Sequence, residues 1–170
     1  MSNPPAPQGP DQSPRRVPDS RVFLAQLMGP GEANLHGNVH GGHIMKLMDE
    51  AGASVAIRHA RREVVTVAVD QVLFREPIHL GDLVTLTSEL TYVGRSSMEV
   101  RIEVSAENLL TGETTHTNTA YFVYVALGPD GRPAAVPPLA LETDEERRNW
   151  EAAKARQAYR LAQRDRQANA

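Results

Sequence analysis

The 170-residue sequence contains no cysteine, which excludes disulfide bonds, thiolate metal sites and a cysteine nucleophile. It has no stretch near the roughly 20 apolar residues that a membrane-spanning helix requires, and its N-terminus lacks the apolar segment of a secretion signal. Positive charge is not in excess, since the formal net charge is -3, so no nucleic-acid partner is predicted. These absences predict a cytoplasmic protein without a membrane span.

The length suits a single domain with tails. Residues 1–19 hold prolines among small polar residues, too little apolar surface to offset the entropy of ordering, so they are predicted to be a disordered tail. Residues 20–140 are predicted to form the domain. Residues 141–170, rich in Ala, Arg, Glu and Gln, are predicted to form a charged helix with a frayed tail.

A strand is predicted from residue 22 to 28 and a helix from residue 42 to 59. One face of this helix carries apolar residues at three- and four-residue spacing, which are Ile44, Leu47, Met48, Ala51 and Val55. The opposite stripe is also small or apolar apart from Asp49. A helix that is apolar on both sides is typically central and buried, so Asp49 is expected in a poorly hydrated place.

Four further segments are predicted to be strands, because they are rich in valine and threonine or alternate apolar with polar residues. They cover residues 64–74, 83–92, 98–106 and 114–127. Consecutive strands of this kind are expected to pair antiparallel and to wrap one face around the helix, an α+β arrangement. A capping-box pattern at residues 143–146 begins the C-terminal helix, for which Trp150 and Tyr159 are the expected anchors.

The turn at His40-Gly41-Gly42 is the first candidate for chemistry. Free N–H groups at the start of a helix can bind developing negative charge, so the turn could serve as an oxyanion hole. A tight turn that needs positive φ is the alternative. His36, His40 and His43 crowd together, but their spacing fits no familiar zinc pattern, so no metal is predicted and His40 is expected to brace the loop.

Asp49 is the second candidate, because a desolvated carboxylate is a better base or a poorly solvated nucleophile. A carboxylate held at an interface by backbone or arginine donors is the alternative. The third candidate is Gly94-Arg95-Ser96-Ser97, whose cation and hydroxyls could hold a phosphate or a pantetheine amide. A polar hairpin turn is the alternative there. No G-x-S-x-G motif is present, which disfavours a serine hydrolase.

The run NLHGNVHGGHIMKLMDEAG at residues 34–52 resembles the signature of the cytosolic acyl-CoA hydrolases, which are hotdog-fold thioesterases. The likeness covers roughly residues 20 to 160 in order. It continues through further short matches at residues 58–59, 69–70, 74–78, 81–82, 94–100, 122–127, 131–133 and 136–139.

The resemblance implies a hotdog fold, in which a curved antiparallel sheet wraps one central helix, here with an exposed C-terminal helix added. It implies sites between two hotdogs, with Asp49 as the carboxylate, Asn34 of the other subunit facing it, and the Gly42 amide as oxyanion donor. It also implies that residues 94–97, which are Gly94, Arg95, Ser96 and Ser97, lie near coenzyme A.

The expected function is therefore hydrolysis of acyl-CoA to fatty acid and CoA by a homodimer, or by a trimer of dimers, without a cofactor. A hotdog dehydratase or hydratase is the enzymatic alternative, since those enzymes pair a histidine with a carboxylate and the fold hosts several chemistries. A non-catalytic CoA- or acyl-binding module is the second alternative.

Overall fold

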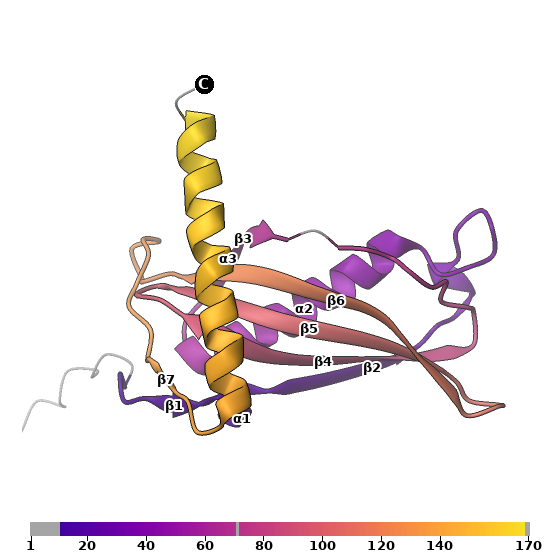
Figure 1. The fold of residues 1–170 in the computed structure, drawn as a ribbon. Coiled ribbons are helices and arrows are strands. Elements are labelled where there is room, and N and C mark those ends of the chain that lie inside the picture. Colours follow the sequence, from indigo (N-terminus) through magenta and orange to yellow (C-terminus); the bar gives the residue numbers. More distant parts are fainter. Residues whose placement is uncertain (1–10, 71, 169–170) are drawn as a thin grey trace, which may run out of the picture.

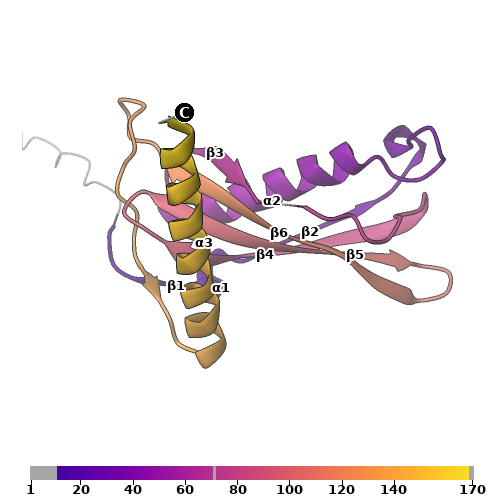
Figure 2. The same ribbon diagram turned by 45° about the horizontal axis from the view of Figure 1, so that its top comes forward.

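The structure is a computed structural model that describes residues 11–70 and 72–168. A five-stranded antiparallel sheet lies between two long helices, α2 (Gly41–Ala60) on one face and α3 (Asp144–Ala168) on the other (Figures 1 and 2). The predicted α+β hotdog architecture, with one central helix and a C-terminal helix, is confirmed. No helix in the described part of the chain is long and apolar enough to cross a membrane.

The sheet has the strand order β2-β4-β5-β6-β3. Its strands are β2 (Val22–Leu27), β4 (Asp82–Val93), β5 (Ser97–Asn108), β6 (Glu113–Ala126) and β3 (Val64–Val69). All five were predicted within a few residues, except that β3 ends before residue 74. It also pairs with β6 at the far edge of the sheet and not with β4, the next strand in the sequence. The connection after β3 therefore leads from this edge strand across the sheet to β4, which lies next to β2 at the other edge.

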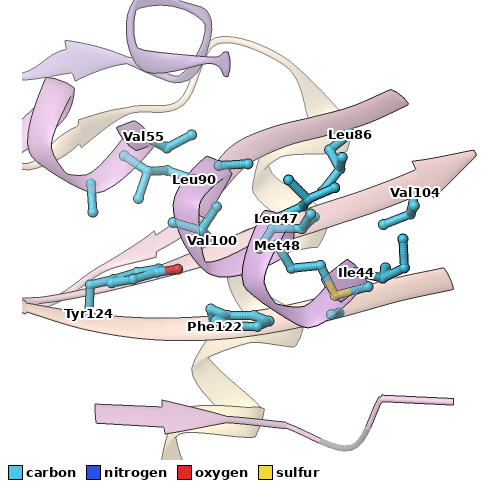
Figure 3. Close-up of a cluster of buried hydrophobic side chains, with 14 of the residues drawn as sticks. Ile44, Leu47, Met48, Val55, Leu86, Leu90, Val100, Val104, Phe122 and Tyr124 are labelled. Carbon is cyan, nitrogen blue, oxygen red and sulfur yellow. The ribbon is translucent and has the colours of Figure 1, made fainter. Parts of the chain in front are cut away.

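The core lies between α2 and the inner faces of β4, β5 and β6 (Figure 3). The predicted apolar stripe of α2 is buried in full, and it packs against alternate residues of the three long strands. Burial of each large apolar side chain contributes about 1.5–3 kcal/mol, so this layer supplies most of the stabilisation. The rings of Phe122 and Tyr124 stack within it, with centroids 6.3 Å apart.

Gly52 allows α2 to approach the sheet closely. A Cβ atom added at this position would overlap the Tyr124 hydroxyl and would lie 3.1 Å from the Ile102 side chain. Both neighbours are buried in the core. The absence of a side chain at Gly52 therefore sets the distance between α2 and β6 at the centre of the fold.

The C-terminal helix begins as predicted, since the Thr143 hydroxyl accepts from the Glu146 N–H at 3.1 Å and Glu146 accepts from the Thr143 N–H at 3.0 Å. Trp150 anchors it on Tyr92, with ring centroids 5.4 Å apart. The expectation for Tyr159 is wrong, because that side chain is 65% exposed. Ion pairs with the sheet hold this part of the helix instead, and α3 continues to Ala168.

The predicted tail boundary at residue 19 is corrected by two short elements, β1 (Arg15–Arg16) and α1 (Val17–Ser20). β1 pairs in parallel with β7 (Leu139–Ala140), and Val17 is buried. The partner strand is distant in the sequence, so the local composition that predicted disorder did not reveal it. Residues 1–10, the rest of that predicted tail, lie outside the described residues, as do residues 169–170 of the C-terminal tail. A 3-10 turn, η1 (Pro30–Glu32), completes the elements.

We expect Gly52→Ala to lower the free energy of unfolding by about 1 kcal/mol. Overpacking against Tyr124 costs about 1–3 kcal/mol, while alanine gains about 1 kcal/mol over glycine inside a helix. Denaturant unfolding measures the difference. Gly31→Ala is the control, since no atom lies within 4 Å of the position that its methyl group would take, and a Gly52 variant as stable as that control would contradict the close approach.

Candidate active site

Asp49 lies in the middle of α2 and faces β3 and β6. Its Oδ1 accepts a hydrogen bond from the Thr66 hydroxyl at 2.7 Å, and the Tyr124 hydroxyl lies 3.3 Å from the same oxygen. Oδ2 accepts no hydrogen bond from any described residue. The donors are hydroxyl groups and not the arginine or backbone groups of the structural alternative. One carboxylate oxygen therefore stays available to a ligand or to water.

Asp49 is only partly buried in the single chain, so the expected poorly hydrated surroundings are not complete. Met45, one turn earlier on the same stripe, is 41% exposed. The stripe of α2 that carries Met45 and Asp49, which was expected to be buried, is therefore partly exposed in a single chain.

Tyr124 is a hydrogen-bond donor and not a base at this site. Burial raises the pKa of its hydroxyl far above the ordinary value, and the negative charge of Asp49 and the hydrogen bond to it raise the pKa further. The hydroxyl also lies 3.1 Å from the backbone carbonyl oxygen of Asp49. The one hydrogen of the Tyr124 hydroxyl is therefore shared between the backbone carbonyl and the carboxylate of Asp49.

Sequence reasoning missed Thr66 and Tyr124. Thr66 is the one hydroxyl-bearing residue of the otherwise apolar strand β3, and it is the direct cross-strand partner of Tyr124. A polar side chain within a valine-rich strand was the available signal for Thr66. Which helix residue it would face depends on the pairing of β3 with β6.

The Gly42 amide donates to Nδ1 of His40 at 2.9 Å, so His40 caps the N-terminus of α2. The prediction that His40 braces the loop is confirmed. The positive-φ alternative for this turn is wrong, because neither Gly41 nor Gly42 has positive φ. The amide that was expected to bind an oxyanion therefore points at a histidine ring in this structure.

Asn34 lies in the loop before α2 and is partly exposed. Its Oδ1 accepts from the backbone N–H groups of His36 at 2.8 Å and Asn38 at 3.2 Å, and its Nδ2 donates to the carbonyl of Val39 at 3.4 Å. No hydrogen bond joins Asn34 to Asp49 among the described residues. Within one chain, Asn34 shapes the loop.

The segment 94–97 forms the turn between β4 and β5, where the Gly94 N–H donates to the Ser97 carbonyl at 2.8 Å. The backbone carbonyls of Arg95 and Ser96 also accept hydrogen bonds, and the Arg95 side chain is exposed. Ser97 lines a groove of 710 Å³ between β3, β6 and α3. Since Ser97 pairs with Val125, it lies on the face opposite to Tyr124 and Asp49, so one chain does not bring these two candidate regions together.

The remaining histidines do not reach Asp49. His43 Nε2 lies 3.2 Å from the side-chain nitrogen of Gln26, and the backbone N–H of His36 donates to Asn34. Within the residues that the structure describes, no three His, Asp or Glu side chains gather closely enough to hold a metal ion.

A profile of the Thioesterase superfamily matches residues 36–113. The chain is 37% identical to the cytosolic acyl coenzyme A thioester hydrolase of Rattus norvegicus over 89% of its own length, but it spans only 40% of that relative. It is 41% identical to the uncharacterized acyl-CoA thioester hydrolase YkhA of Bacillus subtilis, covering 75% of this chain and 74% of that protein.

Solved structures agree with these matches. An apo-hexameric acyl-CoA thioesterase superposes with a TM-score of 0.85 at 36% identity, covering 89% of this chain and 97% of that one. An acyl-CoA hydrolase of Staphylococcus aureus, solved with butyryl coenzyme A and coenzyme A, superposes with a TM-score of 0.83 at 30% identity, covering 91% and 94%.

We expect His40→Ala to lower the free energy of unfolding by about 1 kcal/mol, the usual cost of losing an N-cap side chain. The measurement is thermal or denaturant unfolding at neutral pH. His36→Ala is the matched control, since its side chain is exposed in the same loop, and we expect it to change stability by less than about 0.5 kcal/mol. Equal losses in both variants would show that the cap contributes nothing.

Proposed function

The chain belongs to the thioesterase superfamily, among its hotdog-fold acyl-CoA thioester hydrolases, and we propose that it hydrolyses acyl-CoA to a carboxylic acid and CoA. The observation that carries this proposal is the carboxylate of Asp49, which two hydroxyl groups hold by one oxygen while the other oxygen stays open. The proposal extends to the whole protein, although the chain spans less than half of the curated mammalian relatives it matches.

Three solved variants of the Staphylococcus aureus acyl-CoA hydrolase support the choice of residues. Each replaces one residue with alanine, and the three replaced residues are an asparagine, an aspartate and a threonine. They follow one another at intervals of 15 and 17 residues, as Asn34, Asp49 and Thr66 do in this chain. This spacing supports an active site in which all three take part.

In the proposed reaction, Asp49 takes a proton from water as the water oxygen bonds to the thioester carbonyl carbon. The resulting oxyanion accepts a hydrogen bond from the Gly42 amide, which is fixed in place before charge develops. The carbon–sulfur bond then breaks, and the CoA thiolate takes the proton back from Asp49. Direct attack by Asp49 on the carbonyl, followed by hydrolysis of the anhydride, is the variant route, and both need only water and the thioester.

One of these groups must change its hydrogen-bond partner for the reaction, and another has a donor that is not used. The Gly42 amide has to exchange the His40 ring for the oxyanion, a neutral acceptor for a charged one, which strengthens the bond. Among the described residues, Nδ2 of Asn34 donates only to the Val39 carbonyl, at 3.4 Å, so one of its two amide hydrogens is not used by the loop. We propose that this hydrogen, presented by a second copy of the chain, orients the water or the carbonyl at Asp49.

The exposed groups around Asp49 support a homodimer. β3 is an edge strand with an unpaired side, and Val65 and Val67 on it are exposed. Edge strands of this kind pair readily with another chain, and the exposed Met45 lies on the neighbouring stripe of α2. A second copy at this edge would cover the apolar groups and complete the surroundings of Asp49. Assembly into a trimer of dimers is proposed in line with the hexameric structures that the chain resembles.

We also propose that Gly94, Arg95, Ser96 and Ser97 contact coenzyme A. The exposed Arg95 side chain can pair with a phosphate, and the groove beside Ser97 offers room for part of the nucleotide. Because this segment lies on the face away from Asp49, the CoA would extend around the sheet edge or reach the other copy. We also propose that the protein is cytosolic and that the reaction needs no cofactor.

The alternatives find less support. A dehydratase or hydratase needs a histidine beside the catalytic carboxylate, but His40 and His43 bond to Gly42 and Gln26. A purely binding module would not need a carboxylate held by hydroxyl donors with one oxygen left open. Hydrolysis accounts for this arrangement and for the relatives together.

We expect Asp49→Asn to lower kcat/KM for acyl-CoA hydrolysis at least about 100-fold, because the amide can neither accept the proton nor attack. Release of free thiol from short- to long-chain acyl-CoAs measures it. Glu50→Gln is the matched control on the same turn. Glu50 is exposed and its carboxylate pairs with Lys46 at 3.4 Å on the surface of the helix, so its variant should keep wild-type activity. Near-normal turnover in Asp49→Asn would refute the mechanism.

A site shared by two copies can be tested by mixing inactive variants. We expect Asp49→Ala and Asn34→Ala each to be inactive as pure homodimers. Equal amounts refolded together should recover about a quarter of wild-type activity, since half of the dimers are mixed and each mixed dimer has one intact site. No recovery, with mixed dimers verified by mass spectrometry, would mean that each site lies within one chain.

A further inference from the structure

β3 presents Thr66 to Asp49 directly before an irregularity in its pairing with β6. Residues up to Thr66 pair with β6 in one register, and from Ala68 onward the register is shifted, so Val67 is an extra residue in a β-bulge. Thr66 stands directly opposite Tyr124, and both hydroxyls reach Asp49. A slip of one residue would turn a valine toward Asp49 and Thr66 away from it.

The bulge has to be held on both sides, since a short edge strand can lose a bulge by sliding. Before it, the Leu127 N–H donates to the carbonyl of Glu63 at 2.9 Å. After it, the Asp70 N–H donates to the carbonyl of Tyr121 at 3.0 Å, directly beyond the last residue of β3. The side chain of Asp70 makes a further contact, which does not come from the sheet.

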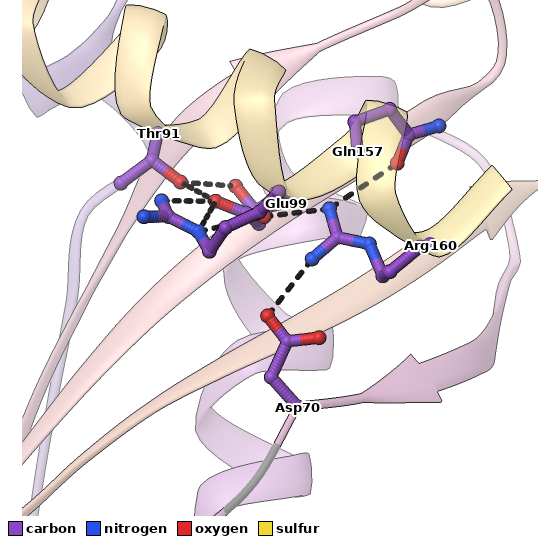
Figure 4. A network of polar contacts seen from close by, with 6 residues as sticks. Asp70, Thr91, Glu99, Gln157 and Arg160 are labelled. Atoms are coloured by element: carbon purple, nitrogen blue, oxygen red, sulfur yellow. Dashed lines mark hydrogen bonds and ion pairs between the residues drawn. The ribbon is translucent and has the colours of Figure 1, made fainter. Parts of the chain in front are cut away.

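That contact comes from α3. Arg160 Nη1 donates to Asp70 Oδ2 at 2.9 Å, and both side chains are largely buried (Figure 4). Arg160 Nη2 donates to Glu99 Oε2 at 2.6 Å, so one guanidinium joins the end of β3 to the middle of the sheet. An ion pair with little access to water is screened weakly, and its geometry is tightly constrained.

Glu99 anchors Arg160 to the core of the sheet. Its side chain is 1% exposed on β5, and it accepts from the Thr91 hydroxyl at 2.8 Å and from Arg156 Nη2 at 2.7 Å. A buried carboxylate with these donors has little freedom to move. The position of Arg160, and through it the position of Asp70, is therefore set by the sheet core and not by solvent.

We propose that Arg160, acting through Asp70, is a positioning residue for the hydrolysis: it holds β3 in its bulged register and so keeps Thr66 hydrogen-bonded to Asp49. This inference rests on the proposed function for its effect on catalysis. Its structural part, the hold on the register of β3, stands by itself. Neither Arg160 nor Asp70 lies within hydrogen-bonding distance of Asp49.

Arg156 provides the matched control within the same helix. It binds Glu99 as Arg160 does, and its guanidinium stacks over the Tyr121 ring at 3.8 Å from the centroid. Within the part of the chain that the structure describes, it makes no hydrogen bond or ion pair to Asp70, although the charge of Asp70 acts on it at longer range. Arg156→Gln therefore weakens the docking of α3 without releasing the end of β3, whereas Arg160→Gln does both.

The test compares Arg160→Gln, Asp70→Asn and Arg156→Gln in steady-state thiol release, well below their unfolding temperatures. We expect kcat to fall about tenfold in the first two, and to stay near wild type in Arg156→Gln. In a Thr66→Val background, Arg160→Gln should cause no further loss, because the two changes remove one shared interaction. Amide hydrogen exchange of residues 64–70 should accelerate in Arg160→Gln and not in Arg156→Gln.

Equal losses of kcat in Arg156→Gln and Arg160→Gln, with equal exchange in β3, would overturn the proposal, since α3 docking alone would then explain the effect. A further loss of kcat in the Thr66→Val background would also overturn it, because Arg160 would act through another route. If the wild-type protein releases no thiol from any acyl-CoA, the proposed function fails. The exchange experiment then decides separately whether Arg160 holds the register of β3.

Discussion

The close packing of α2 on the centre of the sheet is the constraint on which the site depends. Gly52 brings the helix within reach of Tyr124, and this approach puts the Tyr124 hydroxyl beside Asp49 three residues earlier on the helix. The contact lies at the middle of the apolar core, where side chains have little freedom. The carboxylate is thus positioned by the same packing that stabilises the fold, and its orientation does not depend on a mobile loop.

The second support of Asp49 has a different physical basis. β3 is a short edge strand, and it contributes Thr66 from a place where backbone pairing exists on one side only. The buried charges of Glu99 and Arg160 compensate for this weakness by linking the end of β3 to the core of the sheet. An ion pair of this kind adds little net stability once its desolvation is counted, but it selects one geometry among several.

The single chain contains every group of the proposed mechanism, but it does not assemble them. Asn34 and the Gly42 amide are occupied within their own loop, and the apolar stripe beside Asp49 is open. Loop groups that are already hydrogen-bonded are preorganised, so a ligand or a second copy meets donors whose positions are fixed. The incomplete surroundings of Asp49 and the exposed edge strand β3 therefore belong to one surface, which a second copy of the chain would cover.

The sequence by itself determined the elements and their local chemistry. Three- and four-residue spacing defined α2, its buried stripe and the position of Asp49 on the opposite stripe. Two-residue alternation defined the strands, and the glycine turn pointed to Gly42. These signals are short in range, because periodicity and capping involve residues within a few positions of each other. The resemblance to a family added the hotdog fold and the role of Asn34, but it did not supply the contacts of Asp49.

Only the tertiary structure decided which distant segments meet. The pairing of β3 with β6 placed Thr66 at Asp49, the pairing of β1 with β7 ordered residues that the composition marked as a tail, and contacts on the outer face of the sheet anchored α3 through Glu99 and not through Tyr159. Such choices depend on packing and burial between residues far apart in the chain, which no local pattern encodes. The helix and its carboxylate could therefore be predicted from the sequence, whereas the hydroxyl groups and charges that orient the carboxylate could not.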